Sequence, residues 1–281
     1  MTLRDALLSA RLSVDYRNKT GVLRDVSLQI ARHEILGLVG QSGSGKSTLA
    51  LSLMGLLPLK GGLVRGEALF GGKDLLQSPD GQLRAIRGKE ISVVLQSPLS
   101  ALNPAVSIGG QLQEAWRAHE RGKDAQGVAA IEAALQSVSL PADREFLRRR
   151  PSQLSVGQGQ RVCIAMAILH RPALLLADEA TSALDPITQS EILQLFARLN
   201  REMGTAILYI SHDLLSVAAL CHRICILHEG AIVESGMPEA IFNDPQHEYT
   251  RRLVVALPSL PHSHDSETQH SKSPRLELAS R

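Results

Sequence analysis

The chain has 281 residues, of which 44% are hydrophobic and 21% charged, and its formal net charge is +2. This composition is ordinary for a soluble globular protein, and so balanced a charge gives no support to a nucleic-acid partner. No apolar run approaches the roughly 20 residues that span a bilayer, and the N-terminus lacks the apolar core of a secretory signal. Three cysteines make no disulfide framework. We therefore expect a cytosolic protein whose role at a membrane, if it has one, comes through a partner.

The first part of the chain predicts β structure. Apolar and polar residues alternate over residues 10–40, which is typical of antiparallel strands with one solvated face. Within this stretch residues 35–39 form an apolar run that suits a buried strand. Residues 66–70 and 91–95 predict two further strands.

The pattern turns helical from about residue 104 to residue 170, where apolar residues recur three or four positions apart. Strands and helices then alternate, with strands predicted at residues 174–177 and 206–210 and helices at residues 187–203 and 213–220. Such βαβ units predict a parallel core. The fold class is therefore α/β, with a mostly helical insertion in the parallel core.

A Gly-rich motif follows the apolar run at residues 35–39. It fits G-x-x-x-x-G-K-[ST], the phosphate-binding P-loop, and consists of Gly40, Gln41, Ser42, Gly43, Ser44, Gly45, Lys46, Ser47 and Thr48. Its backbone amides and the following helix N-terminus are suited to a polyphosphate. Lys46 adds a charge for the β- and γ-phosphates, and Ser47 offers a hydroxyl to Mg²⁺. The motif predicts nucleotide binding, with ATP and Mg²⁺ as ligands.

A second motif lies more than 130 residues further on, where an apolar strand ends in Asp178-Glu179. Asp178 is placed to hold Mg²⁺, directly or through water. Glu179 is placed to polarise a water for attack on the γ-phosphate. An acidic pair of this kind is the usual partner of a P-loop.

Residues 154–158 read Leu-Ser-Val-Gly-Gln and precede a predicted helix. They resemble the signature sequence of ATP-binding-cassette (ABC) ATPases, usually Leu-Ser-Gly-Gly-Gln. The resemblance implies that Ser155, Gly157 and Gln158 cap ATP held by a second ATPase subunit. Val156 departs from the pattern, and its side chain puts one close backbone approach in doubt because glycine alone has none to clear. We expect the loop to work, since Gly157 remains.

Other residues fall where ABC ATPases carry functional groups, and the resemblance implies their roles. Gln96 stands where the family has the glutamine that reaches Mg²⁺ and the attacking water. His212 matches the histidine that contacts the γ-phosphate, and Asp185 belongs to a loop that crosses the dimer seam. Tyr16 stands where an aromatic ring stacks on adenine.

The resemblance covers roughly residues 8–258 and narrows to one branch at residues 84–91, 96–104 and 245–253. These segments resemble the ATPases of oligopeptide, dipeptide and nickel importers. Membership would imply two integral membrane permease subunits, a second ATPase subunit as hetero- or homodimer partner, and, indirectly, an extracytoplasmic solute-binding protein. It would also imply a peripheral location at the cytoplasmic face of the inner (plasma) membrane.

The domain prediction follows from the same comparison. We expect an ABC ATPase domain over residues 1–257, with a P-loop parallel core resembling RecA, an antiparallel β subdomain and a helical subdomain at about residues 97–172. Residues 258–281 are polar and rich in Pro, Ser and His, and we expect them to be disordered. The sequence names no solute, and an ABC exporter or a non-transport ABC ATPase remains an alternative.

Overall fold

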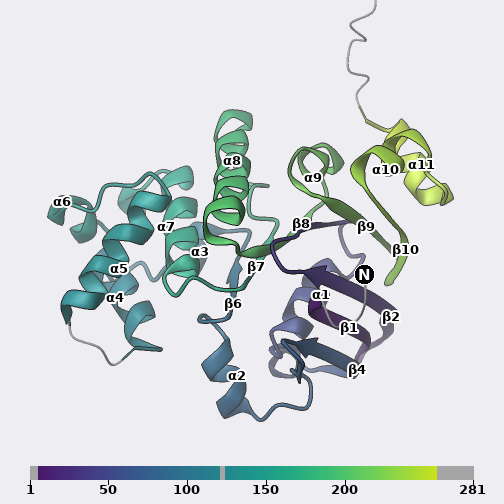
Figure 1. Cartoon of the computed structure of the whole chain (residues 1–281), viewed down its shortest axis with the longest axis horizontal. Coiled ribbons are helices and arrows are strands. Elements are labelled where there is room, and N and C mark those ends of the chain that lie inside the picture. The colour runs from purple at the N-terminus through teal and green to yellow at the C-terminus, as the bar shows by residue number, and fades with distance from the viewer. Residues whose placement is uncertain (1–5, 121–123, 258–281) are drawn as a thin grey trace, which may run out of the picture.

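The computed structural model describes residues 6–120 and 124–257, which form two sheets and a series of helices (Figure 1). The strands are β1 (Ala6–Tyr16), β2 (Lys19–Ala31), β3 (Ile35–Val39), β4 (Gly62–Phe70), β5 (Lys73–Asp74), β6 (Ile91–Val94), β7 (Leu174–Asp178), β8 (Ala206–Ser211), β9 (Arg223–His228) and β10 (Ala231–Gly236). The predicted disordered tail lies outside the described residues.

The α-helices are α1 (Lys46–Leu53), α2 (Asp80–Ile86), α3 (Pro98–Ala101), α4 (Ile108–Arg117), α5 (Asp124–Ser137), α6 (Arg144–Arg148), α7 (Val156–Ile168), α8 (Pro186–Met203), α9 (Leu214–Leu220), α10 (Pro238–Asn243) and α11 (Glu248–Val255). None of the helices in the described ranges is long and apolar enough to cross a membrane.

The larger sheet is the centre of the fold. Its strand order is β10-β9-β3-β8-β7-β6, and all neighbours pair in parallel except β10, which runs antiparallel at one edge. The carboxyl ends of β3, β8, β7 and β6 therefore lie along one edge of the sheet. In open α/β sheets this edge is where ligands bind.

Both faces of this sheet are buried. Ile35, Leu175 and Ile207 belong to one apolar cluster, whereas the alternating neighbours Leu36 and Leu208 belong to another. Alternate side chains of a strand point to opposite faces, so two cores sandwich the sheet. A continuous apolar run is typical of such doubly covered strands.

The smaller sheet has the order β2-β1-β4-β5 and is antiparallel. The predicted antiparallel region at residues 10–40 is right for β1 and β2 and wrong for residues 35–39. These residues form β3, which pairs in parallel with β8 and β9. Residues 35–39 are buried throughout, whereas exposed and buried residues alternate in β2.

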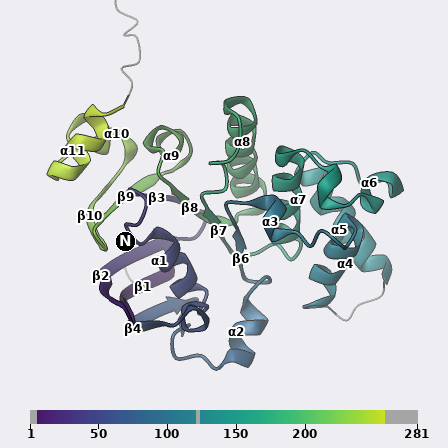
Figure 2. The ribbon, with the colours of Figure 1, turned by 180° about the vertical axis from the view of Figure 1, so that it is seen from behind.

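Helices α3 to α7 lie between β6 and β7 in the chain and gather on one side of the molecule, away from the antiparallel sheet (Figures 1 and 2). The predicted helical stretch is broken into short segments because polar residues cap new helices within it. Ser107, Asp143 and Ser155 each accept a hydrogen bond from a backbone N–H of the helix that follows.

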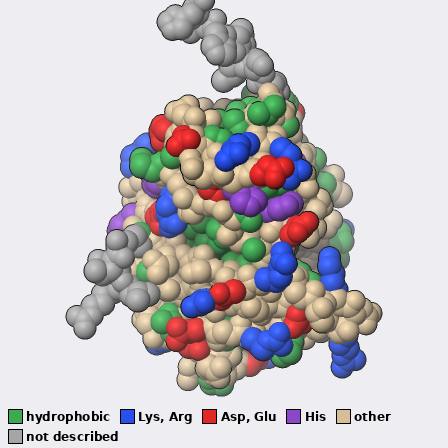
Figure 3. All heavy atoms as spheres, turned by 90° about the vertical axis from the view of Figure 1, so that its right-hand side faces the viewer, with side chains coloured by type: hydrophobic (Ala, Val, Ile, Leu, Met, Phe, Trp, Pro, Cys, Tyr) green, Lys and Arg blue, Asp and Glu red, His purple; other side chains and the backbone are tan. Residues whose placement is uncertain are grey.

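The C-terminal helices α10 and α11 lie at the opposite side of the molecule, beyond β9 and β10. Figure 3 shows the face on this side, where basic and acidic side chains are interspersed and histidine side chains lie in its upper half. No single sign of charge dominates this face.

Candidate functional site: a nucleotide-binding edge of the parallel sheet

The P-loop connects β3 to α1 and curls around the amino group of Lys46. Lys46 Nζ donates to the carbonyl oxygens of Gly40 and Gln41, at 2.7 and 3.0 Å, and the residue is only 4% exposed. Gly45 precedes the helix with φ of +108°, and a Cβ there would lie 2.5 Å from Leu23 Cδ2. Glycine is therefore required at this turn. With no side-chain cap on α1, its first amides remain available to an anion.

Asp178 and Glu179 follow at the carboxyl end of β7. Asp178 Oδ1 is buried without a hydrogen-bond partner. Burial raises the pKa of Asp178, and the charge of Glu179 adds to this, whereas the Ser47 hydroxyl and Lys46 oppose it. A buried carboxylate oxygen that has no hydrogen-bond partner and lies beside a serine hydroxyl suits a hard divalent cation. These residues therefore fit Mg²⁺.

Glu179 lies between two cationic or potentially cationic groups. Its Oε1 is 3.6 Å from Lys46 Nζ, and its Oε2 is 3.7 Å from His212 Nδ1. The backbone of Glu179 has φ of +49°, a left-handed conformation that is uncommon for a residue with a side chain. Strained backbone of this kind is concentrated at functional sites.

A cavity of about 430 Å³ opens at this edge of the sheet. Its walls come from the P-loop, the β1–β2 hairpin and the ends of β6 and β7, and the lining residues are Tyr16, Lys19, Val22, Ser42, Gly43, Gly45, Lys46, Ser47, Thr48, Gln96 and Glu179. The structure thus brings Tyr16 and Gln96 together with the P-loop. Of the other P-loop residues, Gly40, Gln41 and Ser44 do not line the cavity.

Gln96 is tied to the segment after β7. Its Nε2 donates to Ser182 Oγ at 3.1 Å, and Ser182 Oγ donates to the carbonyl of Glu179 at 3.0 Å. This chain of two bonds joins the end of β6 to the acidic pair. The resemblance placed Ser182 in the same loop as Asp185 at the dimer seam, and the bond to Gln96 is what the structure adds.

The signature residues do not line the cavity. Ser155 caps α7, where its Oγ accepts from Gln158 N while Gln158 Oε1 accepts from Ser155 N, both at 3.2 Å. Val156 is 40% exposed, so this loop accommodates its side chain at the surface. Gly157 lies against α8, since a Cβ there would be 2.9 Å from Thr188 Cγ2.

Asp185 lies next to the signature loop. Its carboxylate caps α8 by accepting from the amides of Ile187 and Thr188 and from the Thr188 hydroxyl. The predicted site residues therefore fall into two groups. One lines or supports the cavity at the sheet edge, and the other forms a separate surface at the starts of α7 and α8.

Lys19 and Val22 line the cavity but were not predicted. Tyr16 and Lys19 are register partners across a two-residue turn, which places the lysine beside the aromatic ring. The turn residues are Arg17 and Asn18, which lack the Asn-Gly or Asp-Gly signature of a two-residue hairpin loop, so no sequence signal pointed to Lys19.

Comparison with known proteins agrees with this arrangement. Residues 23–182 match the family model described as ABC transporter. The glutathione import ATP-binding protein GsiA of Salmonella choleraesuis (strain SC-B67) is 40% identical over 266 residues, covering 92% of this chain and 43% of the relative. GsiA of Escherichia coli O1:K1 / APEC is 38% identical, covering 91% of this chain and 42% of the relative. The chain thus spans less than half the length of these curated relatives.

Solved structures give the same result for the fold. The structure of cbiO1 from Clostridium perfringens, part of the ABC transporter complex cbiONQ, has a TM-score of 0.74 at 27% identity and covers 90% of this chain and 96% of its own. A dimeric ATP-binding cassette in a post-hydrolysis state with ADP and Pi has a TM-score of 0.70 at 28% identity, covering 82% of this chain and 98% of its own.

The fold and the P-loop site define an ATP-binding cassette of the P-loop ATPase class. The chain belongs to the ABC transporter family. The predicted fold class and the predicted family are therefore confirmed.

Proposed function

We propose that this chain binds ATP with Mg²⁺ in the cavity at the sheet edge, hydrolyses it, and thereby energises an importer. The observation that carries the proposal is the meeting of a buried Lys46, the unpartnered carboxylate oxygen of Asp178 and the carboxylate of Glu179 at the P-loop. Burying charged groups at the end of a parallel sheet costs free energy, and a bound nucleotide with its cation would compensate for that cost.

Each residue has a distinct task in hydrolysis. Lys46 and the P-loop amides stabilise charge on the transferring phosphoryl group. Glu179 orients the attacking water and accepts its proton, with His212 next to it. Tyr16 supplies an aromatic surface for the adenine ring. Mg²⁺, held by Ser47, Asp178 and Gln96, would neutralise negative charge on the phosphates.

We also propose that two cassettes close around ATP, with the signature loop of one completing the site of the other. This accounts for Ser155, Gly157 and Gln158 lying outside their own chain's cavity. Shifting the ratio of closed to open dimer from 1:99 to 99:1 requires ATP to bind the closed state more tightly by about 5.5 kcal/mol. Charge-assisted hydrogen bonds contribute about 1.5–3 kcal/mol each, so about two to four such contacts suffice.

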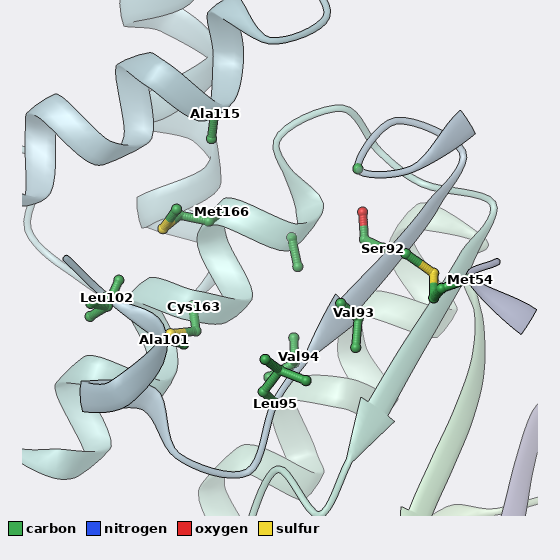
Figure 4. Close-up of a pocket in the computed structure, with 12 residues that line it drawn as sticks. Met54, Ser92, Val93, Val94, Leu95, Ala101, Leu102, Ala115, Cys163 and Met166 are labelled. Atoms are coloured by element: carbon green, nitrogen blue, oxygen red, sulfur yellow. The ribbon is translucent and has the colours of Figure 1, made fainter. Parts of the chain in front are cut away.

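A groove beside the helical segment is the proposed docking site for a permease helix. It has a volume of about 240 Å³ and lies between β6 and α7, with Ser92 and Leu95 on one side and Cys163 and Met166 on the other (Figure 4). Leu95 is 47% exposed there. An apolar groove with exposed leucine suits an apolar helix face. Its position next to Gln96 links the groove to the ATP site.

Our proposal for the transported solute rests on the relatives and on the resemblance at residues 84–91, 96–104 and 245–253. The curated relatives are named for glutathione import, and the branch resemblance adds peptides and nickel. We propose import of a peptide or related small solute. The partners would be two permeases, a second ATPase subunit and, indirectly, a solute-binding protein, with this chain at the cytoplasmic face of the inner membrane.

Two measurements test these proposals. Titration of the purified chain with a fluorescent ATP analogue should show saturable binding that strengthens with Mg²⁺, and absence of saturation would reject the nucleotide site. In membranes containing the permeases, Ala101→Arg, which places a charge at the groove, should abolish co-purification but leave nucleotide binding intact. Ala118→Arg, an exposed alanine on the same helical segment and outside the groove, is the matched control. Equal loss in both variants would argue against the groove.

A further inference from the structure

One peptide group at the start of the P-loop is held from both ends. The carbonyl oxygen of Gly40 accepts from Lys46 Nζ at 2.7 Å, and the N–H of Gln41, which belongs to the same peptide unit, donates to the Tyr249 hydroxyl at 3.1 Å. A peptide unit is planar and its C=O and N–H point in opposite directions. Fixing one end therefore fixes the direction of the other.

Tyr249 is well placed to hold this peptide rigidly. It lies on α11, 208 residues after Gln41, and is only 3% exposed. Its ring stacks on His228, at the end of β9, with 3.8 Å between centroids and an interplanar angle of 15°. Burial raises the pKa of Tyr249 above its usual value, so the hydroxyl is neutral at physiological pH. Ring and hydroxyl thus have separate contacts.

The start of α11 is itself anchored to the parallel sheet. The carboxylate of Glu234, on β10, accepts from the backbone amides of Gln246 and His247 at 2.8 and 3.0 Å. His247 Nδ1 in turn accepts from Tyr249 N at 3.1 Å. The position of the Tyr249 hydroxyl is therefore determined by β10 and β9.

The opposite side of the peptide offers little room for movement. A Cβ on Gly40 would lie 2.3 Å from the carbonyl oxygen of Leu227, at the end of β9. The Gly40–Gln41 peptide is thus packed against β9, bonded to Tyr249 and bonded to Lys46. Of these three constraints, the Tyr249 hydroxyl alone comes from the C-terminal helices.

We propose that Tyr249 is a positioning residue for ATP binding, which orients the Gly40–Gln41 peptide and through it the amino group of Lys46. This inference rests on the proposed nucleotide site and extends it to α11. Tyr249 does not line the cavity, so it acts on ATP only through the P-loop. The C-terminal segment at residues 245–253 thereby becomes part of the ATP-binding machinery.

The test is Tyr249→Phe, which keeps the ring and its stacking on His228 but removes the acceptor for Gln41 N–H. We expect the Kd for ATP to rise about fivefold, equivalent to about 1 kcal/mol. KM for ATP should rise similarly, while kcat changes by less than twofold. The amide of Gln41 should exchange its hydrogen at least about tenfold faster in the nucleotide-free protein, and amides of β3 and α1 should not.

The control is Tyr209→Phe, which removes another buried tyrosine hydroxyl, bonded to Thr181 at 2.8 Å rather than to the P-loop. It should lower the melting temperature without speeding exchange at Gln41. An unchanged Kd and unchanged Gln41 exchange in Tyr249→Phe would overturn the positioning role, as would faster exchange spread evenly over β3 and α1. If wild-type protein fails to bind ATP, the nucleotide site is wrong. The Gln41 exchange still tests the Tyr249 contact in that case.

Discussion

The P-loop and the signature loop both contain glycine and both lead into a helix, yet their surroundings differ. Gly45 leaves α1 without a side-chain cap, and the buried Lys46 is bonded to carbonyls of its own loop. In contrast, α7 begins with a reciprocal capping pair formed by Ser155 and Gln158, and Val156 is exposed at its start. The P-loop curls around its own buried lysine, whereas the signature loop presents Ser155 and Val156 at the surface.

The two loops differ in how many charged groups of this chain surround them. The P-loop has charged groups around it from the ends of β7 and β8, which share an edge with β3, and from the β1–β2 hairpin of the smaller sheet. The signature loop lies at the start of α7, where its immediate neighbour is α8. We propose that it serves a second molecule. The following variants test that division, from the largest expected effect to the smallest.

Glu179→Gln should retain ATP binding but lower turnover by about 100- to 10,000-fold, the usual contribution of a positioned acid or base. The amide is similar in size to the carboxylate but cannot accept the proton from water. Steady-state phosphate release and ATP-analogue titration measure the two properties separately. Undiminished turnover would remove Glu179 from this role.

Lys46→Ala should weaken ATP binding by about 10- to 150-fold, which corresponds to about 1.5–3 kcal/mol for a charge-assisted contact. The affinity for the fluorescent analogue measures it. Because Lys46 also pairs with Glu179 at 3.6 Å, Lys46→Met keeps the apolar stem and is a useful second variant. Wild-type affinity in both would contradict the P-loop assignment.

Ser155→Arg should leave ATP binding to the isolated chain within twofold of wild type, but lower the ATPase activity of the assembled complex at least about tenfold. The arginine would place a bulky side chain where the partner's phosphates are expected. Ala118→Arg, which adds the same charge at an exposed position, serves as a surface control for expression and assembly. Full activity of Ser155→Arg in the complex would argue against the proposed dimer.

Asp178→Asn should stabilise the nucleotide-free protein by about 0.5–1 kcal/mol, a modest figure because the group is partly solvated. The pKa of Asp178 is higher in the folded protein than in the unfolded chain. The free energy of unfolding therefore falls as the pH rises from the unfolded-state pKa to the folded-state pKa. An asparagine does not ionise, so the variant does not lose this stability. The melting temperature should therefore rise at neutral pH, while the strengthening of ATP binding by Mg²⁺ disappears. A lower melting temperature would contradict the raised pKa of Asp178 and its unpartnered Oδ1.

Local pattern predicted much of the fold. Apolar runs located β3, β7 and β8 within one or two residues, since strands buried on both faces are continuously apolar. The prediction of antiparallel pairing was wrong for residues 35–39, because these residues are a continuous apolar run that pairs in parallel with β8 and β9. The sequence pattern also predicted one continuous helical stretch where the structure has several separate helices. The starts of these helices depend on single capping residues such as Ser107 and Asp143.

The sequence by itself determined the P-loop, the acidic pair after β7 and the family, because these depend on residues adjacent in the chain. Tertiary structure alone decided that Gln96 bonds to Ser182, that Lys19 stands beside Tyr16 in the cavity wall, and that Tyr249 holds the peptide of Gln41. These contacts join residues as many as 208 positions apart. Gln96 meets Ser182 because β6 and β7 pair in parallel and their carboxyl ends share one edge of the sheet. Tyr16 meets Lys19 across the β1–β2 hairpin, and Tyr249 reaches Gln41 from α11.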